Sequence, residues 1–83
     1  MMENFNEQLF NTMLFTLIQK YGLFINTKNC ATILGISGRT LDERRKSGMD
    51  CPEYLEEKKC IMYPVQKIVE YQINKTKNSI KTL

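Results

Sequence analysis

The chain has 83 residues, of which 42% are hydrophobic and 25% charged, and its formal net charge is +3. A chain of this length forms one small domain that buries only about 60% of its unfolded surface, which leaves no room for a catalytic domain with a separate regulatory one. The sequence has no histidine, and its three cysteines (Cys30, Cys51 and Cys60) form no CxxC pair, so neither a zinc site nor a disulfide framework is expected.

The same sequence gives little sign of an enzyme or of a membrane protein. It has no glycine-rich nucleotide loop, no metal-ligand cluster and no nucleophile beside a base, so we expect no enzymatic activity and no cofactor. Its first residues are acidic and contain no apolar core of the signal-peptide type, and no apolar run approaches the ~20 residues of a membrane helix. We therefore expect a cytoplasmic protein that does not contact a membrane.

Residues 5–21 are expected to form a helix with a broad apolar face. Phe5, Leu9, Met13 and Leu17 form one row at a spacing of four residues, and Phe10, Leu14, Ile18 and Tyr21 form an adjacent row. Two interpretations stay open: the helix covers the core of the domain, or part of it pairs with a second copy in a symmetric dimer. Phe15 lies outside both rows and is expected to be exposed in a monomer.

Two short helices are expected to follow. Residues 23–27 form either an edge strand or an extended link, and Thr27 stands where the N-cap of the first helix belongs. Gly35 ends that helix. Ser37 is the N-cap of the second helix, residues 38–47, and Gly48 ends it.

The rest of the chain is expected to form a hairpin, a last helix and a tail. The strands of the hairpin are 54–55 and 60–63, with the polar residues 56–59 at its tip. Pro64 suits the first position of the last helix. From residue 74 the chain is polar and basic. We therefore predict one domain over 1–74 and a flexible tail over 75–83.

The two short helices have the spacing of a helix-turn-helix. Ala31 supplies the small side chain where the helices meet, Gly35 supplies the turn, and Leu41 supplies the apolar anchor of the second helix. Ile36 is expected to fill the core beneath the turn. Arg44 departs from the pattern, because that position usually carries an apolar side chain. Either its aliphatic stem packs while its head reaches solvent, or the second helix is rotated.

With Leu41 facing inward, Arg39, Glu43 and Lys46 share the outer face of the second helix. The early residues of such a helix reach base edges in the major groove of DNA. There an arginine can bind guanine, and a carboxylate can accept a hydrogen bond from the amino group of cytosine. The predicted DNA-binding residues are Ser37, Gly38, Arg39, Thr40, Glu43, Arg44, Arg45, Lys46, Lys58 and Lys59. A charged helix is usually only a solvated surface, so this prediction depends on the helix-turn-helix spacing.

The hairpin also has two interpretations. As a wing over residues 56–60, it would bring Lys58 and Lys59 to the DNA backbone or minor groove. As plain structure, it would close the core. Both can hold together, and Glu56 and Glu57 would limit non-specific binding.

The quoted run "FINTKNCATILGISGRTLDERRKSGMDCP", followed by "CIMYPVQKIVEYQ", resembles the excisionase-like branch of the MerR-type DNA-binding proteins. The resemblance covers about fifty residues, and "LFTLIQKYGLFINTKNCATILGIS" is also similar to small phage-type pyocin-activator regulators. It implies a mainly α fold with a small β-hairpin wing: a winged helix-turn-helix preceded by an extra N-terminal helix.

The expected function is sequence-specific binding of double-stranded DNA for a phage or another mobile element. The resemblance implies either a transcription regulator or an excisionase-type recombination directionality factor, with a recombinase or polymerase as partner. One recognition helix binds weakly, so we expect a homodimer or a cooperative oligomer on repeated sites. The alternative is a small adaptor or inhibitor that binds another protein through the apolar face of helix 5–21.

Overall fold

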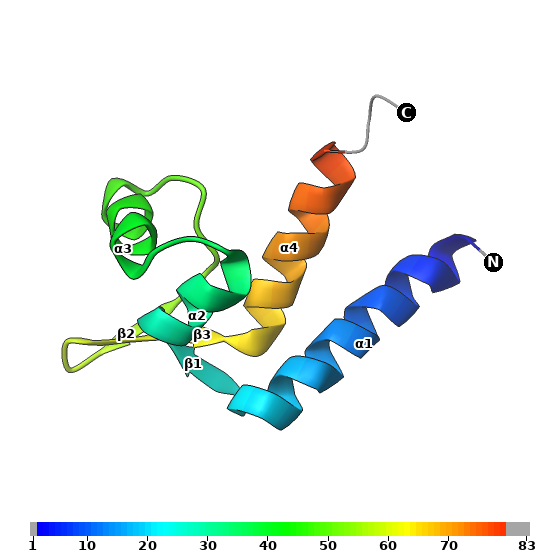
Figure 1. Cartoon of the computed structure of the whole chain (residues 1–83), viewed down its shortest axis with the longest axis horizontal. Coiled ribbons are helices and arrows are strands. Elements are labelled where there is room, and N and C mark those ends of the chain that lie inside the picture. Colours follow the sequence, from blue (N-terminus) through cyan, green and yellow to red (C-terminus); the bar gives the residue numbers. More distant parts are fainter. Residues whose placement is uncertain (1, 80–83) are drawn as a thin grey trace.

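The structure is a computed structural model that describes the backbone of residues 2–79 and the side chains of residues 7–75. Four helices and a three-stranded antiparallel sheet make up this part of the chain (Figure 1). The elements are α1 (Met2–Tyr21), β1 (Phe24–Asn26), α2 (Thr27–Leu34), α3 (Gly38–Ser47), β2 (Leu55–Glu57), β3 (Cys60–Pro64) and α4 (Val65–Ser79). The predicted fold class, mainly α with a small β-hairpin, is confirmed.

The sheet joins the beginning of the helix-turn-helix to the hairpin. Its strand order is β1-β3-β2, so β3 lies in the centre and pairs with both neighbours. Ile25 of β1 lies opposite Tyr63 of β3, and both side chains are buried. Of the two interpretations of residues 23–27, the edge strand is therefore correct. The β2–β3 hairpin extends away from the helices as a narrow arm (Figure 1).

The core lies where the sheet, the two short helices and α4 meet. Its buried side chains are Ile25, Cys30, Ala31, Leu41, Tyr63, Val65, Ile68 and Val69. α1 and α4 lie side by side and run in opposite directions (Figure 1). α1 covers this core with half-buried side chains from both predicted rows, among them Met13 of the first row and Leu14 of the second. Phe15 is 63% exposed, as predicted.

The helix-turn-helix forms as the spacing predicts. Ala31 and Leu41 are buried, and Ile36 packs against the core. Gly35 has a φ of 76°, which is the left-handed conformation that glycine adopts without strain. Its N–H and that of Ile36 donate to carbonyls in the last turn of α2, which ends the helix and starts the turn into α3. Ser37 and Gly48 cap α3 at the predicted positions.

Two predicted helix starts are wrong by one residue. Asn26, not Thr27, is the N-cap of α2, because its side-chain oxygen accepts the N–H of Asn29 at 2.8 Å. Pro64 ends β3 instead of starting α4. The N–H of Val65 donates to the carbonyl of Leu23 at 2.9 Å, which extends the contact between the strands by one residue and delays the helix.

The other boundaries differ because regular structure runs further than predicted. α1 begins at Met2 instead of residue 5, and no glycine or proline interrupts these first residues. The hairpin tip is only Lys58 and Lys59, because Glu56 and Glu57 pair with β3. α4 continues to Ser79, so the first part of the predicted tail is helical. The remainder, 80–83, lies outside the described residues.

The cysteine thiols differ in exposure: Cys30 is buried, Cys51 half-buried and Cys60 exposed. Burial, followed by the nearby Cys51, raises the pKa of the Cys30 thiol to about 12, so Cys30 is an inert core side chain. Within the described part of the chain, no helix is long and apolar enough to cross a membrane. No group of three or more His, Cys, Asp and Glu among those residues is placed to hold a metal ion.

Candidate nucleic-acid interface

The start of α3 is held by its N-cap. The Ser37 hydroxyl oxygen accepts the backbone N–H of Thr40 at 3.0 Å, and the same hydroxyl donates to Thr40 Oγ1 at 2.9 Å. These bonds fix the first turn of α3, on which Gly38, Arg39 and Thr40 lie. Since Leu41 is fully buried directly after this turn, the orientation of α3 is set by the core. The cap and the buried Leu41 together fix the position of the first turn of α3 relative to the core.

Three predicted residues lie together on the outer face of α3. The Arg39 side chain is 89% exposed, and its Nε lies 3.5 Å from Oε2 of Glu43, which is 67% exposed. Lys46 continues the same face and is also exposed. An exposed ion pair at this spacing contributes only about 0.3–0.5 kcal/mol. Arg39 can therefore leave Glu43 for a better partner at little cost.

Arg45 does not join this outer face. Its side chain is only 14% exposed, and its Nη2 lies 3.3 Å from Oδ1 of Asp42. The guanidinium also lies over the ring of Tyr54, with 5.7 Å between its central carbon and the ring centroid. Arg45 thus ties α3 to the segment before the hairpin. The prediction that Arg45 binds DNA receives no support from this placement.

Arg44 is also turned away from the outer face. Its Nη1 lies 3.4 Å from Oδ2 of Asp50 and donates a long hydrogen bond of 3.5 Å to the Tyr71 hydroxyl. Its side chain is 31% exposed, so the stem covers apolar surface while the head stays at the rim. The unusual arginine at this helix-turn-helix position therefore connects α3 to α4.

Asp50 is the centre of this connection, and it is not among the residues predicted from the sequence. The Tyr71 hydroxyl donates to its Oδ1 at 2.8 Å, and Lys75 Nζ lies 2.8 Å from its Oδ2. Asp50 itself has a φ of 44°, in the left-handed region. Its partners on α4 lie 21 and 25 residues away in the chain, so no local pattern could have shown the contact.

The charge of Asp50 should make part of the stability depend on pH. Two hydrogen bonds lower the pKa of the Asp50 carboxyl below its usual range: the one from Lys75 has the larger effect, and the one from Tyr71 the smaller. The carboxylate therefore stabilises the folded state above the unfolded pKa of about 3.9, and this contribution is lost as the pH falls through the lowered value. We expect Asp50→Asn to be less stable than the natural protein at about pH 7, with the difference shrinking toward about pH 2.

Urea unfolding of both proteins across this pH range measures the effect. Asparagine tolerates the left-handed backbone at this position, so the substitution tests the charge and not the turn. Glu53→Gln is the matched control, because Glu53 is 78% exposed and its one ion pair among the described residues is with Lys67, at 3.6 Å. Equal losses for the two variants, or a difference for Asp50→Asn that does not change with pH, would contradict this role.

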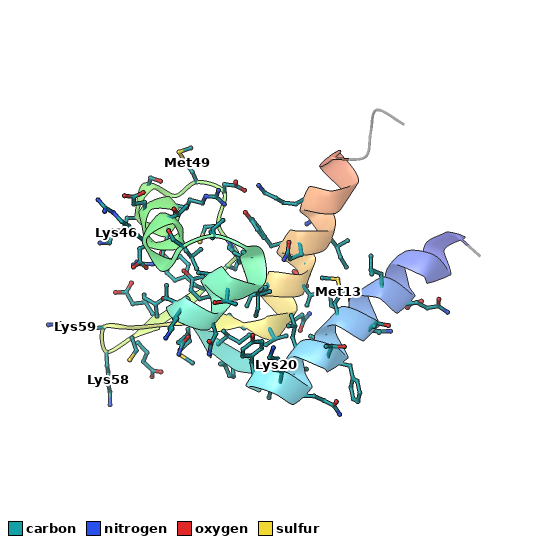
Figure 2. The ribbon with its side chains drawn as sticks, in the orientation of Figure 1. Met13, Lys20, Lys46, Met49, Lys58 and Lys59 are labelled. Carbon is teal, nitrogen blue, oxygen red and sulfur yellow. The ribbon has the colours of Figure 1, made fainter. Side chains whose placement is uncertain are left out.

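The tip of the hairpin carries the remaining predicted residues. Lys58 and Lys59 connect β2 to β3 as a two-residue turn, and both are exposed. Their φ angles are 51° and 68°. Positive φ at both central residues is the mark of a type I′ turn, which asparagine and glycine occupy with least strain. Figure 2 shows Lys46, Lys58 and Lys59 at the same end of the molecule, away from α1.

Of the ten predicted residues, the structure thus brings four cations, Arg39, Lys46, Lys58 and Lys59, to exposed positions on α3 and the hairpin tip. Ser37 and Thr40 serve the N-cap, and Gly38 opens the helix. Glu43 forms an ion pair with Arg39. Arg44 and Arg45 hold α3 in place through Asp50 and Tyr54, respectively.

Comparison with known protein families and with curated proteins finds no match to this chain. The resemblance to excisionase-like and MerR-type proteins therefore stays a prediction, based on the short sequence motifs quoted for it. The function has to be argued from the geometry of α3 and the hairpin.

Proposed function

We propose that the protein binds double-stranded DNA in a sequence-specific manner, with α3 in the major groove and the hairpin tip on the backbone or in the minor groove. It acts for a mobile genetic element in the cytoplasm, as a transcription regulator or as an excisionase-type directionality factor. The observation that carries the proposal is Arg39, which is 89% exposed on the first turn of a helix anchored by a buried leucine. Arginine at this position suits the paired acceptors of guanine.

The hairpin tip supports the same proposal. A non-glycine residue in the left-handed region costs about 1–2 kcal/mol, and both tip residues are lysines in that region. Strained backbone of this kind is concentrated at functional sites. Two lysines make a poor turn but place two positive charges at the end of an arm, where they suit phosphate oxygens.

The acidic residues nearby limit how much binding is non-specific. Glu43 lies beside Arg39, and Glu56 and Glu57 precede the hairpin tip. One protomer therefore offers few phosphate contacts. We propose that two or more copies fill repeated sites, as a homodimer or cooperatively, and that a recombinase or polymerase is the partner recruited there.

The salt dependence of binding to a mixed-sequence duplex tests the phosphate contacts. Each phosphate contact lowers the slope of log binding constant against log salt by about 0.9, so the three exposed lysines, Lys46, Lys58 and Lys59, predict a slope of about −2.7 per protomer. Lys58→Asn with Lys59→Gly removes both tip charges and replaces them with the residues that a type I′ turn favours. We expect this double variant to fold at least as stably as the natural protein while its salt slope falls to about a third.

Fluorescence anisotropy with a labelled duplex gives the slope, and thermal unfolding gives the stability. Glu56→Gln is the control, because it removes a charge beside the tip without removing a cation, and its salt slope should not fall. An unchanged slope for the double variant would exclude the hairpin tip from the interface. Absence of binding at about 50 mM salt would contradict DNA binding altogether.

A second function is favoured by one observation on α1. Phe15 is 63% exposed on a helix whose exposed side lacks charged residues over three turns. A protein adaptor or inhibitor would use such a surface. It would keep the helix-turn-helix only as a scaffold, so that substitutions at Arg39 would leave its activity intact.

A further inference from the structure

The side chains of Arg39 and Glu43 form an ion pair with each other and, within the described residues, no other ion pair or hydrogen bond. Arg39 Nε lies 3.5 Å from Glu43 Oε2, and both side chains are largely exposed. The other acid of α3 differs, because Asp42 pairs with Arg45, whose side chain is only 14% exposed. The partner of Glu43 is therefore the same arginine that is proposed to bind guanine.

Binding of guanine would change the surroundings of the Glu43 carboxylate. Four residues of an α-helix span about 6 Å, and base pairs are about 3.4 Å apart, so Glu43 lies over a base pair one or two steps from the guanine. When Arg39 turns to the guanine, the carboxylate loses its cation and enters a groove between two rows of negative phosphates. An unpaired carboxylate that also loses water is strongly unfavourable. Glu43 then requires a hydrogen-bond donor from the DNA.

The bases offer few such donors in the major groove. Cytosine presents its N4 amino group, and adenine presents its N6 amino group beside the acceptor N7, whereas guanine and thymine present no donor. The lone pair of adenine N7 repels a carboxylate but accepts a hydrogen bond from an amide. Glutamate therefore favours cytosine, and glutamine favours adenine, to which it can bind through both N6 and N7.

We propose that Glu43 is a specificity-determining residue that accepts a hydrogen bond from the amino group of a cytosine, one or two base pairs from the guanine bound by Arg39. This inference rests on the proposed function and narrows its substrate to duplexes that contain both bases at this spacing. It also couples the two bases. On a duplex without the guanine, Arg39 keeps Glu43 as its partner, and the cytosine contributes little. The carboxylate thus adds discrimination more than affinity.

Selection from a random-sequence duplex library, on the natural protein and on Glu43→Gln, tests the identity of the second base. The natural protein should enrich a motif with a guanine and, one or two positions away, a cytosine. Glu43→Gln should keep the guanine and exchange the cytosine for an adenine. Its melting temperature should stay close to that of the natural protein, because Glu43 is 67% exposed and its ion pair is weak.

Glu7→Gln is the matched control for this selection. It removes the same charge from an exposed position on α1, which lies away from α3 and the hairpin (Figure 1). Its enriched motif should be that of the natural protein, so that a change seen with Glu43→Gln reports on the position of the charge and not on the net charge.

Competition binding with four related duplexes measures the coupling. In the duplex with the guanine, replacing the cytosine by thymine should weaken binding about tenfold. In the duplex whose guanine is replaced by adenine, the same change should weaken binding by less than about twofold, because two contacts that share a partner are not additive. Glu43→Gln should bind a mixed-sequence duplex about threefold more tightly than the natural protein does, because one negative charge is removed from the face toward the phosphates.

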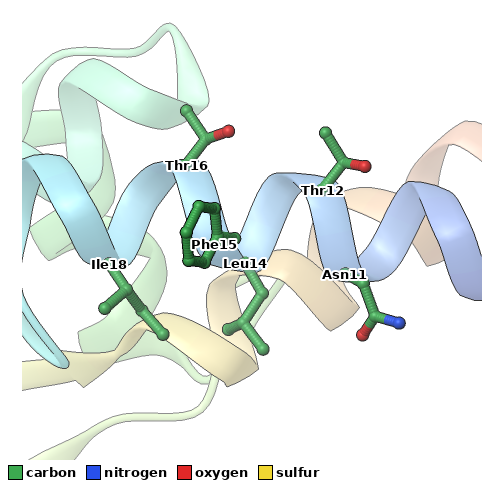
Figure 3. A pocket seen from close by; sticks show the side chains of 6 residues that line it. All are labelled: Asn11, Thr12, Leu14, Phe15, Thr16 and Ile18. Atoms are coloured by element: carbon green, nitrogen blue, oxygen red, sulfur yellow. The ribbon is translucent and has the colours of Figure 1, made fainter.

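Each outcome decides the proposal. A cytosine that becomes an adenine in the motif of Glu43→Gln, together with coupled losses, would support it. A natural motif without a fixed cytosine, a cytosine that Glu43→Gln retains, or equal losses in both duplexes would overturn it and leave the proposed function intact. The absence of any enriched motif would overturn both. The groove around Phe15 on α1 would then be the better candidate for a binding surface, and Figure 3 shows the side chains that line it: Asn11, Thr12, Leu14, Phe15, Thr16 and Ile18.

Discussion

Replacement of Arg39 and Thr40 together by alanine is expected to remove the preference for the DNA site while leaving the fold intact. A bidentate arginine–guanine contact contributes about 1–3 kcal/mol of discrimination, so binding to the preferred duplex should fall by roughly 100-fold, toward that of a mixed-sequence duplex. The fold should persist, because Arg39 is 89% exposed and the cap bond uses the backbone N–H of residue 40. Competition between the two duplexes measures the preference.

The matched control is Lys28→Ala with Thr32→Ala on α2. It also removes one cation and one hydroxyl from exposed positions one helix away. It is expected to weaken binding to both duplexes by the same small factor and so to keep the preference. If the Arg39 and Thr40 double variant also kept its preference, the first turn of α3 would not read bases, and the protein adaptor would become the better account.

Leu41→Ala is expected to have the largest effect on stability. Leu41 is fully buried and is the only core side chain of α3 among the described residues. Truncating such a leucine costs about 2–5 kcal/mol, a large share of the 5–15 kcal/mol that small domains have in total. The melting temperature should fall by more than about 10 °C. DNA binding should be lost with the fold at the higher temperatures and return on cooling.

Leu55→Ala is the comparison for this variant. Leu55 lies on β2 and is 53% exposed, so its truncation should change the free energy of unfolding by less than about 0.5 kcal/mol. Urea unfolding measures both. A cost below about 1 kcal/mol for Leu41→Ala would mean that α3 is not anchored through this side chain. The rigid presentation of Arg39 would then have no basis.

The helix-turn-helix could be predicted from the sequence because its determinants are local. Gly35 and Gly48 end helices in the left-handed conformation, and Ser37 caps the helix that follows it. The burial of Leu41 and the exposure of Arg39 follow from helical periodicity once the cap is placed. Each of these signals spans fewer than ten residues, so one sequence was sufficient to find them.

The features that the sequence did not reveal depend on distant partners. Asp50 holds Arg44 of α3 and Tyr71 of α4 together, and nothing near it in the chain indicates this. The inward position of Arg45 likewise depends on the ring of Tyr54. Residues 75–79 continue α4 although their composition is that of a tail, and the contact of Lys75 with Asp50 lies at the point where the helix was expected to end.

The most direct test of DNA binding is selection of duplexes from a random-sequence library on the purified protein, with the bound fraction sequenced as the salt concentration rises. Binding by α3 predicts that one short motif becomes enriched and survives salt, in copies whose spacing reports the arrangement of the protomers. Uniform retention that salt removes steeply would mean that only phosphates are contacted and would contradict sequence-specific binding. No retention at any salt concentration would contradict DNA binding itself.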